Sequence, residues 1–166
     1  SVQKLKMSNS LQILMPAHNE GKNIKNHITR VNNILKKKIK FSFLICEDGS
    51  SDNTLEILKR LKKKFKIRIL SKKEKQGYST AVMSGIKRAK ADYLLIMDSD
   101  GQCDPRQIFK FWNARKKADL VKTNVPRAQK LKKTAKIAVL GGFGALAPAP
   151  SPQGPAQGLK MESDCN

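Results

Sequence analysis

The chain has 166 residues, and its 34 Lys and Arg against 13 Asp and Glu give it a formal net charge of +21. This length predicts a single domain that can bury a proper hydrophobic core. No apolar run approaches the roughly 18 residues that a membrane-spanning helix needs, and residues 1–10 lack the apolar stretch of a signal peptide. We therefore expect a cytoplasmic protein whose membrane contact, if any, is peripheral and at the inner face of the membrane.

The positive charge has two interpretations. It could indicate an anionic partner, namely nucleic acid, a lipid surface or a phosphorylated substrate. Lys greatly outnumbers Arg, however, which favours a compositional bias over a surface that recognises phosphates. The clusters Lys36–Lys38, Lys62–Lys64 and Lys72–Lys75 fall at predicted helix ends or in loops, where solvated lysines are ordinary.

The cysteines give a weaker indication of the compartment. Cys46, Cys103 and Cys165 show neither CxxC spacing nor a nearby His. They predict free thiols in a reducing compartment and argue against a zinc site or a disulfide framework.

Strand and helix patterns alternate from the beginning of the chain. Leu11–Met15 is typical of a buried strand that ends at Pro16, and Phe41–Cys46 is typical of a second strand. Between them, a helix that follows Gly21 carries one apolar stripe, formed by Ile24, Ile28, Val31 and Leu35.

A second helix follows Ser51 or Asp52, either of which can cap it. Its inner face is expected to consist of Leu55, Leu58, Leu61 and Phe65. The remaining predicted elements are a strand at Ile67–Leu70, a helix over residues 79–89, a strand at Tyr93–Met97, a helix after Pro105 and a candidate strand at Asp119–Thr123. This alternation predicts an α/β fold with a parallel sheet and crossover helices.

The composition changes abruptly at Gly141. Half of the 10 Gly and four of the 7 Pro lie between Gly141 and Gly158. Such a segment cannot bury enough apolar surface to offset the entropy that ordering would cost. We expect residues 141–166 to form a disordered Gly/Pro/Ala-rich tail, and a truncated gene would show the same kind of break.

The few acidic residues gather just after the predicted strands. They are Glu20, Glu47, Asp48, Asp52, Asp98, Asp100 and Asp104. In an open α/β sheet, ligands bind in the crevice outside the carboxyl ends of the strands. A lysine-rich chain that concentrates carboxylates there is expected to hold a metal ion or a sugar at an enzyme site.

Each loop also has a purely structural interpretation. Glu20 precedes the first helix, where its charge would stabilise the helix end, and Asp48 and Asp52 could form an Asx turn and a helix cap. The pair Asp98 and Asp100 can bind a hard divalent cation whose remaining ligands are diphosphate oxygens and water. Turn formation is the alternative for this pair.

Three segments resemble motifs of one enzyme family. The opening motif of the family 2 glycosyltransferases resembles residues 13–20, ILMPAHNE, and their second motif resembles residues 45–54, ICEDGSSDNT. The third is similar to residues 91–102, ADYLLIMDSDGQ, which follow the small residues Gly77, Ala81, Gly85 and Ala89. This third segment, with Gln102 at its end and Pro105 shortly after it, is similar to that of the polyprenyl-phosphate branch of the family, which includes the dolichol-phosphate mannose synthases.

The resemblance implies a truncated GT-A fold, a Rossmann-like three-layer sandwich with a mainly parallel central sheet. It also implies a UDP- or GDP-linked sugar donor, with Mg²⁺ or Mn²⁺ as the cofactor. By family analogy, the nucleotide pocket would be lined by Pro16, Ala17, Glu20 and Asp48. Asp98 would lie near the ribose or sugar and contribute to the metal site, and Asp100 would bind the metal. Lys72, Lys73 or Lys75 could add positive potential near the diphosphate.

The half of the fold that binds the acceptor is not recognisable. Inverting members of the family need a further carboxylate as general base, and past Asp119 the only acids are Glu162 and Asp164. We therefore divide the chain into a basic extension (1–10), a nucleotide-sugar-binding half-domain (11–127), a basic segment without an assigned structure (128–140) and the tail (141–166). His27 is expected at the surface.

Three functions remain open. The first is a glycosyltransferase whose acceptor is a polyprenyl phosphate or a glycan, and the second is a non-catalytic module that binds a nucleotide sugar in the same pocket. The third, a basic nucleic-acid-binding protein, is disfavoured because only 5% of the residues are aromatic and no recognition motif is present.

Overall fold

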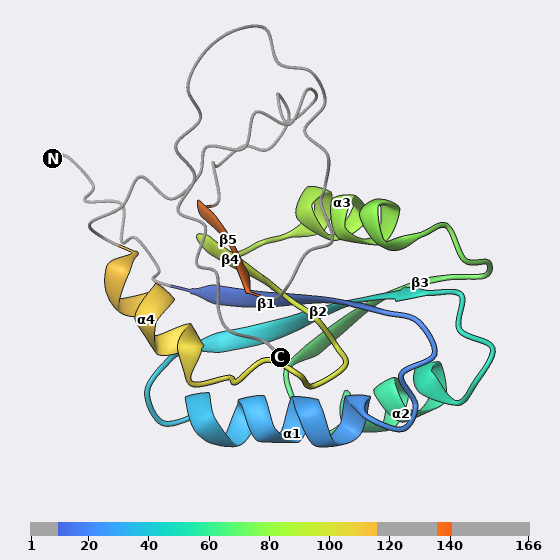
Figure 1. Cartoon of the computed structure of the whole chain (residues 1–166), viewed down its shortest axis with the longest axis horizontal. Coiled ribbons are helices and arrows are strands. Elements are labelled where there is room, and N and C mark those ends of the chain that lie inside the picture. Colours follow the sequence, from blue (N-terminus) through green and yellow to red (C-terminus); the bar gives the residue numbers. More distant parts are fainter. Residues whose placement is uncertain (1–9, 116–135, 141–166) are drawn as a thin grey trace, which may run out of the picture.

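The structure, a computed structural model, describes residues 10–115 and 136–140. Strands and helices alternate through these residues (Figure 1). The elements are β1 Leu11–Ala17, α1 Ile24–Leu35, β2 Phe41–Asp48, α2 Thr54–Leu61, β3 Ile67–Lys72, α3 Tyr78–Arg88, β4 Tyr93–Met97, α4 Gln107–Ala114 and β5 Lys136–Leu140.

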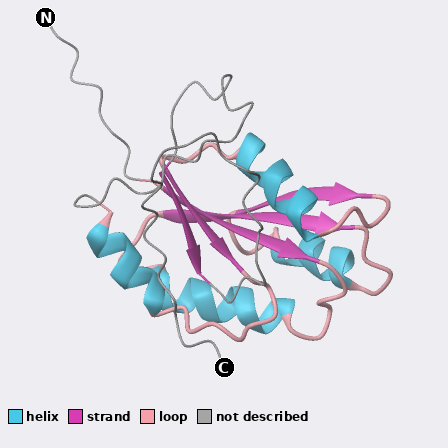
Figure 2. Cartoon of the chain, turned by 45° about the horizontal axis from the view of Figure 1, so that its top comes forward, coloured by secondary structure: helices cyan, strands magenta, loops and turns pink. Residues whose placement is uncertain are grey.

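The strands form one sheet in the order β3-β2-β1-β4-β5, and every neighbouring pair is parallel. Helix α3 covers one face of the sheet, and α1 and α2 cover the other (Figures 1 and 2). Helix α4 packs on the same side as α1, because its buried residues Ile108 and Phe111 join the cluster that α1 forms with the sheet. The predicted three-layer α/β architecture is confirmed.

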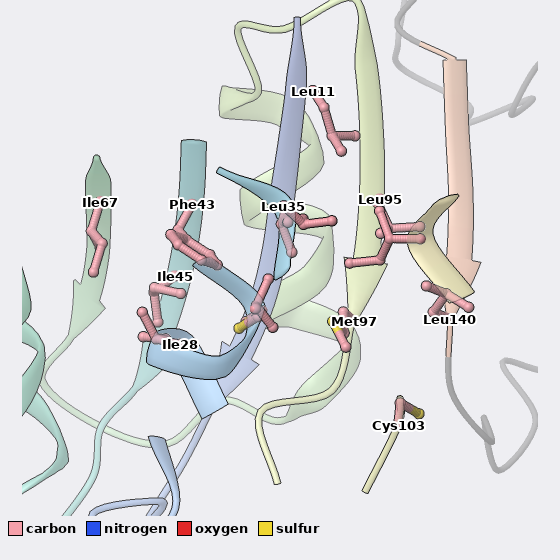
Figure 3. Close-up of a cluster of buried hydrophobic side chains, with 14 of the residues drawn as sticks. Leu11, Ile28, Leu35, Phe43, Ile45, Ile67, Leu95, Met97, Cys103 and Leu140 are labelled. Carbon is pink, nitrogen blue, oxygen red and sulfur yellow. The ribbon is translucent and has the colours of Figure 1, made fainter. Parts of the chain in front are cut away.

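Side chains that alternate along the strands build a core on each face of the sheet. In β1, Leu11, Ile13 and Met15 belong to the larger cluster beneath α1, α2 and α4, whereas Leu14 faces α3. Figure 3 shows the larger cluster, to which Leu140 contributes from β5. All seven residues of β1 are buried, as expected for the central strand of a sheet covered on both faces.

The first two strands are longer than predicted. β1 continues through Pro16 to Ala17, although we expected Pro16 to end it. β4 pairs with β1 only as far as Leu14, whereas β2 pairs with it to Ala17. Beyond Leu14 the strand has one bonded neighbour, so a residue without an N–H is tolerated there. β2 likewise runs on to Asp48.

The fifth strand was not predicted. β5 lies in the segment 128–140, which the sequence left without an assigned structure, and it pairs with β4 from Tyr93↔Lys136 to Met97↔Leu140. The candidate strand at Asp119–Thr123 and the expected tail lie outside the described residues. None of the described helices has the length and hydrophobicity of a membrane span.

The expectation of free thiols holds for one of the two cysteines that the structure describes. Cys46 is a buried free thiol, and burial raises its pKa to about 11. Cys103 is disulfide-bonded, so the expectation was wrong for this residue.

Gly85 lets α3 lie close to the sheet. A Cβ at this position would be 2.3 Å from Leu14 Cδ1 and 2.7 Å from Cys46 Sγ. Gly85→Ala is therefore expected to lower the free energy of unfolding by about 1–3 kcal/mol, because the added methyl overpacks the core.

Chemical denaturation measures this effect. Thr80→Ala, at an exposed position of the same helix, is the control and should change the free energy of unfolding by less than about 0.5 kcal/mol. Equal stability of the Gly85 variant and the wild type would contradict the close packing of α3 on β1 and β2.

Candidate functional site

A cavity of about 360 Å³ opens where β1, β2 and β4 end. All six residues that the sequence placed at the site line this cavity, namely Pro16, Ala17, Glu20, Asp48, Asp98 and Asp100. The other lining residues are His18, Lys75, Tyr78, Ala81 and Ser99. Of the three lysines proposed to lie near a diphosphate, only Lys75 reaches this cavity.

Asn19 joins the loop after β1 to the loop after β2. Its side-chain Oδ1 accepts hydrogen bonds from the backbone N–H of Ser51 (2.9 Å) and Asp52 (3.3 Å), and its own N–H donates to Ser50 Oγ (3.0 Å). Asn19 has a φ of 54°, in the left-handed region that Asn tolerates better than most residues. We did not predict this role from the sequence. The available signal was an Asn in a loop at the end of a strand.

Glu47 and Asp52 hold the loops together instead of lining the cavity. The buried Glu47 carboxylate accepts hydrogen bonds from Ser50 N–H (2.6 Å) and Ser71 Oγ (2.7 Å). Asp52 accepts from the backbone N–H of Gly21 (3.0 Å) and Thr54 (2.9 Å). The N-cap of α2 is Asn53, so the prediction that Ser51 or Asp52 caps this helix was wrong by one or two positions, and the contacts of Asp52 are structural.

Asp48 is fixed in the cavity wall. It is 3% exposed, and its two carboxylate oxygens accept hydrogen bonds from the backbone N–H of Gln76 (2.9 Å) and Gly77 (2.8 Å). The neighbouring Gly49, with φ +61°, lies against the 74–75 backbone, where a Cβ would be 2.4 Å from the Glu74 carbonyl carbon. Each Asp48 oxygen has a further lone pair with which it can accept a hydrogen bond from a ligand.

The loop after β4 presents two carboxylates. Asp98 Oδ1 accepts a hydrogen bond from the Tyr78 hydroxyl (3.1 Å), and Asp100 Oδ1 accepts one from Gln102 N–H (3.0 Å). Burial raises the pKa of Asp98, and the Asp100 charge adds to this, whereas the Tyr78 hydrogen bond opposes it. A positive charge bound here would relieve the repulsion between the two carboxylates.

Glu20 faces the same group of negative charges. Burial raises its pKa, the hydrogen bond from Asn23 opposes this, and the charges of Asp100, Asp52 and Asp98 raise it further. The electrostatic potential of the cavity is therefore suited to a hard cation. Lys75 is the only cationic side chain among the residues that line it.

His27 is buried beneath the loop that carries Asp98 and Asp100, where we had expected a surface residue. It is 3% exposed, and neither ring nitrogen has a hydrogen-bond partner among the described residues. A Cβ on Gly101 would be 3.6 Å from His27 Nδ1, so the imidazole lies directly against this loop. The signal was present in the sequence, because position 27 falls on the apolar stripe of α1 beside Ile24 and Ile28.

Residues 12–139 match the sequence model of the family described as glycosyl transferase family 2. The chain belongs to this family. A dolichol-phosphate mannosyltransferase from Pyrococcus furiosus is 29% identical over 106 residues, which are 64% of this chain and 30% of that protein. A poly-β-1,6-N-acetyl-D-glucosamine synthase from Staphylococcus aureus is 31% identical over 90 residues, which are 54% of this chain and 21% of that protein.

The fold of this family 2 domain is also similar to that of a solved structure. A mannosyltransferase from Pyrobaculum calidifontis, in complex with GDP-Man and Mn²⁺, superimposes with a TM-score of 0.50 at 17% sequence identity. The similar region covers 54% of this chain and 27% of that one. The chain thus spans about a third or less of the length of the relatives it matches.

His27→Leu is expected to remove an acid sensitivity of the fold. Burial lowers the pKa of His27 below its usual 6.5, and this outweighs the opposing effects of the Asp98 backbone and the Asp100 charge. The unfolded state therefore binds more protons at this residue. The contribution of uncharged His27 to the stability of the fold is fully present above a pH of about 6.5 and falls as the pH decreases below that value.

Chemical denaturation at about pH 7.5 and about pH 5 tests this prediction. The wild type should lose more stability on acidification than the Leu variant. At neutral pH the variant should be at least as stable as the wild type, because a buried imidazole without hydrogen-bond partners gains little over an apolar group of similar size. An identical pH dependence of both proteins would contradict the buried, uncharged state of His27.

Proposed function

We propose that the chain forms the nucleotide-sugar-binding part of a metal-dependent glycosyltransferase. The donor is a UDP- or GDP-linked sugar, and the acceptor is a molecule such as a polyprenyl phosphate or a glycan. The observation that carries this proposal is the convergence of Pro16–Ala17, Asp48, Asp98 and Asp100 on one cavity at the carboxyl ends of the strands, within a family 2 domain.

The rigid wall of the cavity is suited to hold a nucleobase. Asp48 is held by two backbone N–H groups, and its free lone pairs can accept hydrogen bonds from ring N–H groups. Both uracil and guanine carry such groups on their Watson–Crick edges, so the proposal leaves the base open. Lys75, on the same cavity, supplies positive charge for a diphosphate.

Asp98 and Asp100 fit a divalent cation that binds together with its substrate. No cluster of three or more metal-ligating side chains occurs in residues 10–115 and 136–140. Mg²⁺ is usually bound through one or two carboxylates plus substrate phosphates. Asp98 and Asp100 supply two carboxylates, in a cavity where the other acidic side chains add negative charge. The complex of the Pyrobaculum calidifontis enzyme with GDP-Man and Mn²⁺ supports a divalent metal, and the proposal leaves the choice between Mg²⁺ and Mn²⁺ open. When bound, the cation would neutralise charge on the departing nucleoside diphosphate.

The acceptor is inferred from a relative. The name of the Pyrococcus furiosus relative favours a polyprenyl phosphate, and with it a peripheral contact with the membrane. The described residues after Asp104 contain no Asp or Glu that could act as general base. The second candidate is a module that binds the nucleotide sugar in the same cavity without transferring the sugar, since it needs this cavity and no general base.

Titration calorimetry with UDP and with GDP, each with and without Mn²⁺, tests the proposed donor site. One nucleotide should bind more tightly in the presence of Mn²⁺. Asp100→Ala should weaken that metal-dependent binding about tenfold or more, because a contact to a charged group is lost.

Asp104→Ala removes the same side chain from a position four residues further along that does not line the cavity, and it should leave the binding unchanged. A folded chain that binds neither nucleotide would contradict the donor site. Release of free sugar from a UDP- or GDP-sugar would favour the enzyme over the non-catalytic module.

A further inference from the structure

A second concave region lies at the opposite edge of the sheet, where β2 begins. It is a groove of about 470 Å³. It is larger than the cavity of about 360 Å³ at the ends of β1, β2 and β4, which we call the donor cavity. Five lysines line it, namely Lys36, Lys37, Lys38, Lys40 and Lys66. Asn32, Ile39, Phe41 and Phe43 complete its walls, and no Asp or Glu is among its lining residues. We call these residues the lysine groove.

The lysines come from two connections with the same pattern. Residues 35–41 read LKKKIKF and residues 61–67 read LKKKFKI, so lysine occupies eight of the ten positions in 36–40 and 62–66. Each connection turns in the same way after its helix, because Lys38 and Ile39 donate to the Leu35 carbonyl as Lys64 and Phe65 donate to that of Leu61. Both connections lead into neighbouring parallel strands, which brings them to one edge of the sheet.

Intramolecular contacts do not neutralise these charges. The three salt bridges within the described residues all use arginine, so no lysine of the groove takes part in one. A helix C-terminus favours a nearby cation, but the effect is confined to the last turn and cannot account for five ammonium groups around one groove. Their mutual repulsion would be relieved by a bound polyanion.

The two concave regions also differ in charge. Four carboxylates and one lysine line the donor cavity, whereas five lysines and no carboxylate line the groove. A general lysine bias does not by itself predict that one concave region collects five lysines without an acidic side chain. Lys36–Lys38 are exposed, as expected for solvated lysines, and the fold in addition places them around one concave region.

We propose that the lysine groove binds an anion with two or more closely spaced phosphate groups, at a site separate from the donor cavity. Ammonium groups on flexible stems contact phosphates as point charges and do not require the fixed geometry of a guanidinium. Such phosphates occur within soluble polyphosphates, and side by side on neighbouring lipids in an anionic membrane surface. The inference goes beyond the proposed function, because the groove and the donor cavity share no residue.

Two triple variants with the same change in charge test the site. Lys36→Gln, Lys40→Gln and Lys66→Gln together remove three ammonium groups from the groove, and Lys62→Gln, Lys63→Gln and Lys64→Gln remove three from the same edge without touching it. Binding of inorganic triphosphate is measured by calorimetry at low salt without divalent metal. The groove variant should bind triphosphate about tenfold more weakly than the wild type, or weaker still. The control should lose less than about threefold in affinity.

Vesicles distinguish the two sources of phosphate. Each protein is also mixed with vesicles of phosphatidylglycerol and, as the uncharged reference, of phosphatidylcholine. Loss of binding in the groove variant alone, to triphosphate or to phosphatidylglycerol, supports the site, and the probe that binds more tightly identifies the source. Unchanged UDP or GDP binding by the groove variant would separate this site from the donor cavity.

Three results would overturn the proposal. The first is equal weakening in both triple variants, which would indicate diffuse attraction to a basic surface. The second is no binding to either probe by the folded wild type. The third is binding of a short DNA duplex that both variants weaken equally, without binding of triphosphate, since this would assign the lysines to non-specific contact with nucleic acid.

Discussion

The parallel pairing of β1 with β2 on one side and with β4 on the other brings the ends of three strands to one edge of the sheet. Every residue of β1 is buried, and its side chains pack into the cores on both faces of the sheet, so a shift in register would disrupt both cores. The loops that follow the three strands are therefore held close together. They carry the carboxylates of Glu20, Asp48, Asp98 and Asp100 to one cavity, although these residues lie far apart in the sequence.

Hydrogen bonds between the loops then fix the shape of that cavity. Asn19 binds the loop after β2, and Asp48 binds the loop before α3. Burial raises the pKa values of Glu20 and Asp98, and the charges of the neighbouring carboxylates raise them further, so the charged forms are unfavourable here. A cation bound with a diphosphate would stabilise the charged forms, so the same arrangement that disfavours the empty site favours the proposed ligand.

The sequence predicted what local patterns determine. Apolar runs and stripes revealed the first four strands and the helices, and the position of acids after strands indicated the residues that line the cavity. Features that depend on contacts between distant segments were missed. The burial of His27 needs the loop at Gly101 above it, and the separation of Glu47 from the cavity needs Ser71 on β3. β5 is a short apolar run near many lysines, and it is recognisable as a strand only beside β4.

The central claim is that one cavity at the carboxyl ends of β1, β2 and β4 holds both the nucleotide and the metal. Amide NMR spectra recorded during a titration with paramagnetic Mn²⁺, in the presence of the bound nucleoside diphosphate, test it most directly. We predict that line broadening begins at residues 98–101 and extends to the loops at residues 17–20 and 75–78, and that the lysine groove stays unaffected. Broadening centred on another part of the chain, or none with the nucleotide bound, would contradict the account.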